Sequence, residues 1–180
     1  MKSFMKKFLT LFLVAVGATG GLCAGEPAAP EQKLAALGLK LPAPASVIAN
    51  YVPAVRSGRL VFLAGQIPRG ADGKIIAGKV GRDFSETQAA EAARTCALQL
   101  LAALKAEIGD LAKVSRIVRV GGFVNCTEEF TAQPKVVNGA SDLLVAVFGE
   151  KGRHARAAVG VHSLPGGAPV EVELVAEVAE

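Results

Sequence analysis

The stretch from residue 85 to residue 109 constrains the fold more than any other, because it carries a complete helix signature. Ser85 and Gln88 have the spacing of a capping box, which satisfies free backbone amides where a helix begins. Apolar residues then recur at helical spacing: Ala89, Ala92, Ala93, Cys96, Leu100, Leu104 and Ile108. Gly109 is the residue type that most often ends a helix. A long helix with one apolar side has to pack that side against another layer.

The segments around this helix alternate between strand and helix patterns. A β-branched run over residues 114–124 predicts a long strand, and residues 135–148 predict a second helix. Ahead of the first helix, residues 60–67 predict a central strand because they are apolar on both faces, with a shorter strand over 52–55. A short helix is predicted over residues 31–39.

The end of the chain predicts a hairpin, with strands over residues 155–162 and 170–178 and a turn at 164–168. Alternation in the last strand places Glu171 and Glu173 on one face and its valines and leucine on the other. In the preceding strand we expect one set to face the helices: Ala157, Val159 and Val161. We expect the other set to face away: Arg156, Ala158, Gly160 and His162. The sequence therefore predicts an α+β fold, a mixed β-sheet with two helices on one face, whose other face meets partner subunits.

The first 24 residues have the layout of a secretory signal peptide. Three lysines precede an apolar run over residues 8–16 that is too short to cross a bilayer, and small residues follow over 17–24. We expect cleavage after Gly20 or Ala24 and a periplasmic or secreted protein, which contacts a membrane only through the leader if the leader stays uncleaved. Residues 25–46 are predicted to be a linker and a short N-terminal helix, and residues 47–180 the working domain.

Composition and motif searches exclude several classes of protein. With 51% hydrophobic and 20% charged residues, the chain is not intrinsically disordered. The formal net charge is +4, but three lysines belong to the leader, which leaves 17 basic and 16 acidic residues, or +1. That balance argues against nucleic acid as a partner. We find no phosphate-binding loop, no dinucleotide fingerprint and only two histidines, so we expect no metal and no cofactor. For Cys96 and Cys126 we favour two free thiols over one disulfide.

Arg156 is the residue that points to chemistry. It interrupts a run of alanine and valine in a predicted strand, where small neighbours leave room for a small ligand. A guanidinium cannot act as a base, but it grips a carboxylate through two parallel hydrogen bonds. Glu171, expected on the adjoining strand, could act as acid or base if burial raises its pKa. The alternative interpretation is a solvated arginine and an ordinary charged strand face.

Six short blocks resemble the RidA (YjgF) family, in the order in which that family has them. They are Tyr51-Val-Pro-Ala-Val-Arg-Ser-Gly58, Ala64-Gly-Gln-Ile-Pro68, Val137-Asn138, Ala155-Arg-Ala-Ala-Val159, Leu164-Pro165 and Val170-Glu-Val-Glu173. The extra segment near residues 31–41 resembles the longer branch of the family, whose members are called endoribonuclease or chorismate-mutase-like proteins. The resemblance implies a chorismate-mutase-like α+β fold, a homotrimer, and pockets at the subunit interfaces.

The resemblance also implies an activity, the hydrolysis of 2-imino or 2-enamino acids to 2-oxo acids and ammonia without a cofactor or metal. On that basis Arg156 holds the substrate carboxylate and Glu171 positions the attacking water, while Tyr51, Gly65 and Asn138 line the pocket, partly from a neighbouring subunit. The chain departs from the family at Ala158, where a cysteine is common. Two alternatives stay open: a protein that binds small carboxylates without catalysis, and an endoribonuclease.

Overall fold

The computed structural model describes residues 29–44 and 49–179, so the predicted signal peptide lies outside the described residues. The elements, in chain order, are α1 (Pro30–Ala36), β1 (Ala54–Ser57), β2 (Leu60–Gln66), α2 (Glu86–Ile108), β3 (Val114–Asn125), α3 (Gln133–Phe148), β4 (Ala155–Val161) and β5 (Val170–Val178). Within these ranges, no helix is both long and apolar enough to span a membrane.

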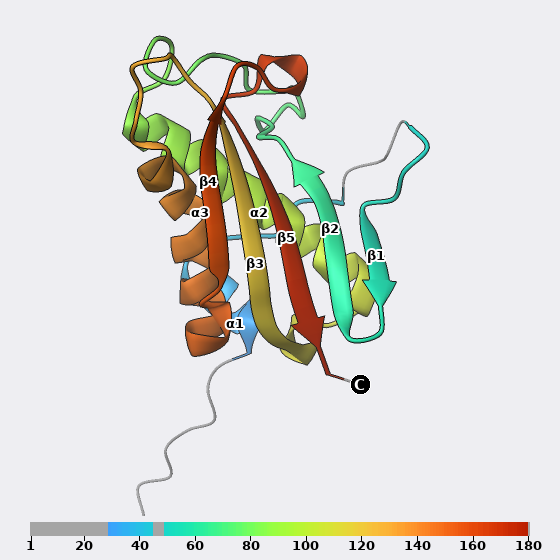
Figure 1. The fold of residues 1–180 in the computed structure, drawn as a ribbon. Coiled ribbons are helices and arrows are strands. Elements are labelled where there is room, and N and C mark those ends of the chain that lie inside the picture. The colour runs from blue at the N-terminus through green and yellow to red at the C-terminus, as the bar shows by residue number, and fades with distance from the viewer. Residues whose placement is uncertain (1–28, 45–48, 180) are drawn as a thin grey trace, which may run out of the picture.

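The five strands form one sheet in the order β1-β2-β5-β3-β4, and the helices cover one of its faces (Figure 1). β3 and β4 run parallel, while the other neighbours are antiparallel. This arrangement confirms the predicted α+β fold with a mixed sheet. α1 adds a third helix to the covered face: Leu34 is buried in the common core, and the Glu31 carboxylate accepts a hydrogen bond from the Leu111 amide at 3.2 Å.

The predicted C-terminal hairpin is wrong. β4 and β5 are not neighbours, because β3 lies between them and pairs with both. The reason is the connection through α3: a helix that joins two strands lets them run parallel and side by side, which a tight turn cannot do. β5 instead takes the centre of the sheet, between β2 and β3.

The helix signature predicted from the sequence is confirmed at both ends. The Gln88 amide donates to Ser85 Oγ at 3.2 Å and the Ser85 amide donates to Gln88 Oε1 at 3.0 Å, which completes the capping box. Gly109 ends α2 in a left-handed conformation with φ of 84°. The two cysteines of the described chain are free thiols, Cys96 buried and Cys126 half-buried, as predicted.

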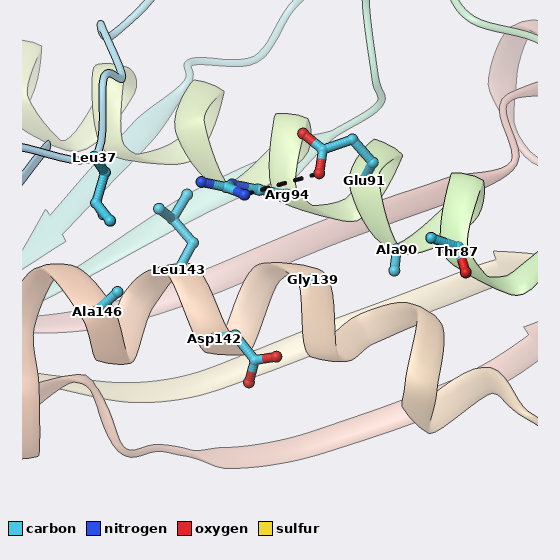
Figure 2. A pocket seen from close by; sticks show the side chains of 9 residues that line it. All are labelled: Leu37, Thr87, Ala90, Glu91, Arg94, Gly139, Asp142, Leu143 and Ala146. Atoms are coloured by element: carbon cyan, nitrogen blue, oxygen red, sulfur yellow. Dashed lines mark ion pairs between the residues drawn. The ribbon is translucent and has the colours of Figure 1, made fainter.

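α2 and α3 approach one another closely at Gly139. A Cβ atom at this position would overlap the carbonyl group of Ala90 on the facing helix. Figure 2 shows both residues where the two helices lie side by side. A side chain at Gly139 would therefore force the two backbones apart.

The Lys79 side chain connects the loops at one end of the sheet through hydrogen bonds. The Lys79 ammonium donates to Asn125 Oδ1 at 2.7 Å, to the Cys126 carbonyl at 3.2 Å and to the His162 carbonyl at 2.7 Å. An ammonium has three N–H groups, so these bonds use all of them. Asn125 is only 5% exposed and donates to the Ala168 carbonyl at 3.1 Å, which brings the far end of the β4–β5 loop, the loop that also contains His162, to the same point.

Candidate functional site

Arg156 lies near the start of the edge strand β4, and its guanidinium reaches under the sheet edge to α3. Nη1 donates to Asn138 Oδ1 at 2.8 Å and to Ser141 Oγ at 3.0 Å. Nη2 donates to the Pro134 carbonyl at 3.3 Å. The structure thus brings together two predicted site residues, Arg156 and Asn138.

The face predicted for Arg156 is wrong. We expected it to face away from the helices, but it shares the helix-covered face with Ala158 and Gly160. Val159, expected to face the helices, is 45% exposed instead. The physical reason is that β4 carries small residues on both faces, so apolar alternation did not decide between them. At a sheet edge, the long aliphatic part of an arginine side chain can also extend toward a neighbouring helix and pack against it.

Two of the five guanidinium donors are free to bind a ligand. The contacts to α3 use both N–H groups of Nη1 and one of Nη2, and a guanidinium has five. Nε–H and one Nη2–H therefore have no partner in the described part of the chain. No described carboxylate forms an ion pair with Arg156. The pair Nε and Nη2 forms the edge of a guanidinium that grips a carboxylate through two parallel bonds.

Glu171 lies in the central strand β5 on the opposite face of the sheet. It alternates with Val170 and Val172, which are buried against the helices. Its carboxylate lies over Gly65 of β2, where any Cβ atom would overlap it. Burial raises the pKa of Glu171 above its usual range, and repulsion from the Glu173 carboxylate raises it further. A carboxyl of this kind exchanges a proton more readily near neutral pH.

The predicted site residues therefore form two separate groups within one subunit. Arg156 and Asn138 lie on the helix side of the β4 edge, whereas Glu171 and Gly65 lie on the open face. Glu171 is not on the strand adjoining Arg156, as we predicted, because β3 lies between them. Tyr51 is 58% exposed and precedes β1, the strand at the other edge of the sheet. A single subunit does not bring Arg156 and Glu171 together.

Sequence reasoning missed two residues beside Arg156. Ser141 lies one helical turn after Asn138 on α3, and His154 precedes Arg156 by two positions. Ser141 Oγ and His154 Nε2 are 3.0 Å apart. Two sequence signals could have found them: the helical spacing of Asn138 and Ser141, and the position of one of only two histidines beside the arginine.

Two hollows elsewhere on the surface are weaker candidates. One, of about 340 Å³, lies between α2 and α3 (Figure 2). Its cation, Arg94, already faces the Glu91 carboxylate at 3.9 Å, and Asp142 adds a second carboxylate. The other, of about 380 Å³, adjoins Cys126 and His162. Among residues 29–44 and 49–179 no three histidine, cysteine, aspartate or glutamate side chains are grouped to hold a metal ion.

Comparison with known proteins places this geometry in a family. A family model described as "YjgF/chorismate mutase-like, putative endoribonuclease" matches residues 31–178. Protein TCP17 of Trypanosoma cruzi is 46% identical over 157 residues, which cover 87% of this chain and 96% of that protein. A "putative endoribonuclease" structure from Shewanella oneidensis MR-1 superposes with a TM-score of 0.81 at 35% identity, over 84% of this chain and all of that one.

A solved structure of RidA from the Antarctic bacterium Psychrobacter sp. PAMC 21119 has the same fold. It superposes with a TM-score of 0.52 at 25% identity, over 76% of this chain and 94% of that chain. The family match spans α1 through β5 and so includes Arg156, Asn138, Gly65 and Glu171. These matches confirm the resemblance drawn from the sequence blocks, and this chain belongs to the YjgF/RidA-like family.

Proposed function

We propose that this protein is a deaminase that hydrolyses reactive 2-imino and 2-enamino acids to 2-oxo acids and ammonia. The observation that carries the proposal is the Arg156 guanidinium, which α3 holds through three N–H groups while Nε–H and one Nη2–H have no partner among the described residues. These two N–H groups match the carboxylate that every 2-imino acid carries beside its C=N bond. Membership of the YjgF/RidA-like family also supports the proposal, because the resemblance to that family implies this hydrolysis.

The proposal requires more than one subunit, and we propose a homotrimer. Arg156 and Glu171 lie on opposite faces of the sheet, so a site that uses both takes them from different subunits. The open face also carries an apolar row across three paired strands, Val55, Phe62 and Val175, of which Val55 is 53% and Phe62 46% exposed. Exposed apolar rows of this kind are typical of subunit interfaces. Closed rotational symmetry would present the open face of each subunit to the β4 edge of the next.

The chemistry needs only water and a proton carrier. The Glu171 carboxylate takes a proton from water as the water oxygen bonds to C2 of the imine. The proton passes to the imine nitrogen and gives a carbinolamine, in which C2 carries a hydroxyl and an amino group. The hydroxyl then gives up its proton through Glu171 to the amino nitrogen, the C–N bond breaks as the C=O bond forms, and ammonia leaves the 2-oxo acid behind. An enamine first becomes the imine by gaining a proton at C3 and losing one from its nitrogen. Arg156 holds the substrate carboxylate throughout. Catalysis therefore comes from the positioning of substrate and water and from the raised pKa of the Glu171 carboxyl.

The test is a hydrolysis assay on the purified protein. 2-Iminopropanoate is generated in place from alanine by an amino-acid oxidase, and the imine that remains is trapped with semicarbazide and measured by absorbance. We expect the imine to disappear faster than in buffer, in proportion to protein concentration. A rate equal to that of buffer overturns the proposal. Binding of pyruvate without turnover would instead indicate a carboxylate-binding protein, and cleavage of labelled RNA that resists repurification would indicate the endoribonuclease named in its relatives.

Gly65 offers a test of the role of Glu171. The Gly65→Ala variant places a methyl group where the Glu171 carboxylate lies, and that carboxylate is the far end of a flexible side chain. We expect the side chain to move aside at little cost in stability, while kcat for 2-iminopropanoate falls by about a hundredfold because the proton carrier is displaced. Thermal unfolding and steady-state kinetics measure both effects. Unchanged kcat in a folded variant would remove Glu171 from the mechanism.

We propose in addition that the protein is exported and works in the periplasm or outside the cell. The support is the leader pattern of residues 1–24 in the sequence. When the full chain is expressed in a bacterium with two membranes, we expect it in the periplasmic fraction with an N-terminus at Gly21 or Gly25. Intact-mass spectrometry reads the terminus. A full-length chain confined to the cytosolic fraction contradicts the proposal.

A further inference from the structure

The hydrogen bonds behind Arg156 have a defined direction. His154 Nδ1 lies 2.6 Å from the Gly152 carbonyl oxygen. A carbonyl oxygen only accepts, so Nδ1 carries the proton. Burial and the nearby Arg156 cation together lower the pKa of His154 more than its hydrogen bond to the Gly152 carbonyl raises it, which favours the neutral ring with Nε2 bare.

Ser141 completes the chain between the ring and the guanidinium. Its Oγ lies 3.0 Å from His154 Nε2, and because Nε2 is bare the hydroxyl donates its proton to that nitrogen. The same oxygen then has its lone pairs free and accepts from Arg156 Nη1, also at 3.0 Å. The result is one chain of bonds with a single polarity, from Arg156 to Ser141, to His154, to the Gly152 carbonyl.

His154 keeps the serine available to the arginine. A serine inside a helix commonly turns its hydroxyl back to a carbonyl of its own preceding turn. Ser141 is in mid-helix in α3, and the acceptor on His154 draws its hydroxyl toward β4 instead. Together with Asn138 Oδ1, the serine oxygen occupies both N–H groups of Nη1. The guanidinium plane is thereby fixed, and the hydrogen bonds to α3 use Nη1 and Nη2 but not Nε.

We propose that Ser141 and His154 are positioning residues, which set the direction in which Arg156 presents its free edge to a carboxylate. The inference rests on the proposed function for the identity of that carboxylate. Neither residue touches the substrate, and both act through the guanidinium. Their loss leaves the charge of Arg156 in place but allows its plane to turn.

The experiment measures carboxylate binding and hydrogen-bond geometry separately from turnover. Pyruvate is titrated calorimetrically into the wild type, Ser141→Ala, Ser141→Thr and His154→Phe, with the exposed Ser163→Ala as a matched control. We expect Kd for pyruvate to rise about tenfold in Ser141→Ala and His154→Phe, the loss of one charge-assisted hydrogen bond. Ser141→Thr keeps the hydroxyl and Ser163→Ala lies outside the site, so both should bind as the wild type does. In turnover, KM should rise while kcat changes little.

Nitrogen-15 spectra report the geometry directly. In the wild type we expect His154 as the neutral tautomer protonated at Nδ1, and a slowly rotating Arg156 Nη1 resonance that is lost in Ser141→Ala. The inference is overturned if Ser141→Ala binds pyruvate as tightly as the wild type, if wild-type His154 carries its proton on Nε2, or if the wild type does not bind pyruvate. Binding that depends on Ser141 without imine hydrolysis would remove the proposed deaminase activity and leave the inference standing. Hydrolysis that is indifferent to Ser141 would do the reverse.

Discussion

Replacing Arg156 with Ala is expected to reduce kcat/KM for 2-iminopropanoate by about a hundredfold or more, the cost of losing a charged, bidentate anchor. Glu171→Gln is expected to reduce kcat by about a hundredfold to ten-thousandfold, because an amide cannot carry the proton between water and the imine nitrogen. Both changes lie at half-exposed or exposed positions, so the variants should fold. Steady-state kinetics on the purified variants measure each loss.

Mixing the two inactive variants should restore activity, which is a more demanding expectation. If each site takes Arg156 from one subunit and Glu171 from another, mixed trimers contain some sites in which both residues are native. Random exchange of equal amounts gives about a quarter of the sites in that state. The control is the double variant Arg156→Ala/Glu171→Gln mixed with Arg156→Ala, in which no native site can form. If the first mixture, with subunit exchange verified by mass spectrometry, is no more active than its components, the two residues do not meet across an interface.

Gly139→Val is expected to have the largest effect on stability. Its Cβ alone would overlap the Ala90 carbonyl group, which belongs to the backbone of α2 and cannot rotate away. Replacing glycine with valine gains about half a kcal/mol of helix propensity at most. Overpacking costs about 3 kcal/mol where the backbone has to move, so the collision dominates. At about 2–4 °C per kcal/mol for a chain of this size, Tm should fall by about 6–12 °C.

Ala146→Val is the matched control, because it also introduces a β-branched side chain into α3 but at an exposed position. It should lower Tm by no more than about 2 °C, the effect of helix propensity alone. Calorimetric melting of both variants makes the comparison. Equal Tm values for the two variants would show that α2 and α3 can separate freely at Gly139.

What the sequence predicted well is local. The capping box at Ser85, the glycine that ends α2 and the strand over β3 each depend on residues a few positions apart, and each was confirmed. Which strands are neighbours in a sheet depends on segments far apart in the sequence. The predicted hairpin of β4 with β5 was wrong because the sequence shows two strands joined by a turn, but it does not show that β3 lies between them in the sheet.

The candidate site was likewise predicted in its residue types but not in its long-range arrangement. Arg156 and Asn138 were predicted as site residues and lie in direct contact. The face of Arg156 was wrong, because alanine, glycine and valine on both sides of β4 give no alternation to follow. Ser141 and His154 were missed because their role depends on hydrogen bonds between α3 and the residues before β4. Helical spacing and the position of the histidine could mark them as candidates, but neither signal shows those contacts.

The central place of β5 has a consequence for how the protein is made. β5 is made after the other four strands of the sheet, and until it inserts, β2 and β3 have no partner between them. The nascent chain therefore cannot close its sheet before residues 170–178 have been made, and the pairing of β5 with β2 and β3 comes late in folding. A chain whose sheet stays open until β5 has been made is also one that a translocation channel can still accept unfolded.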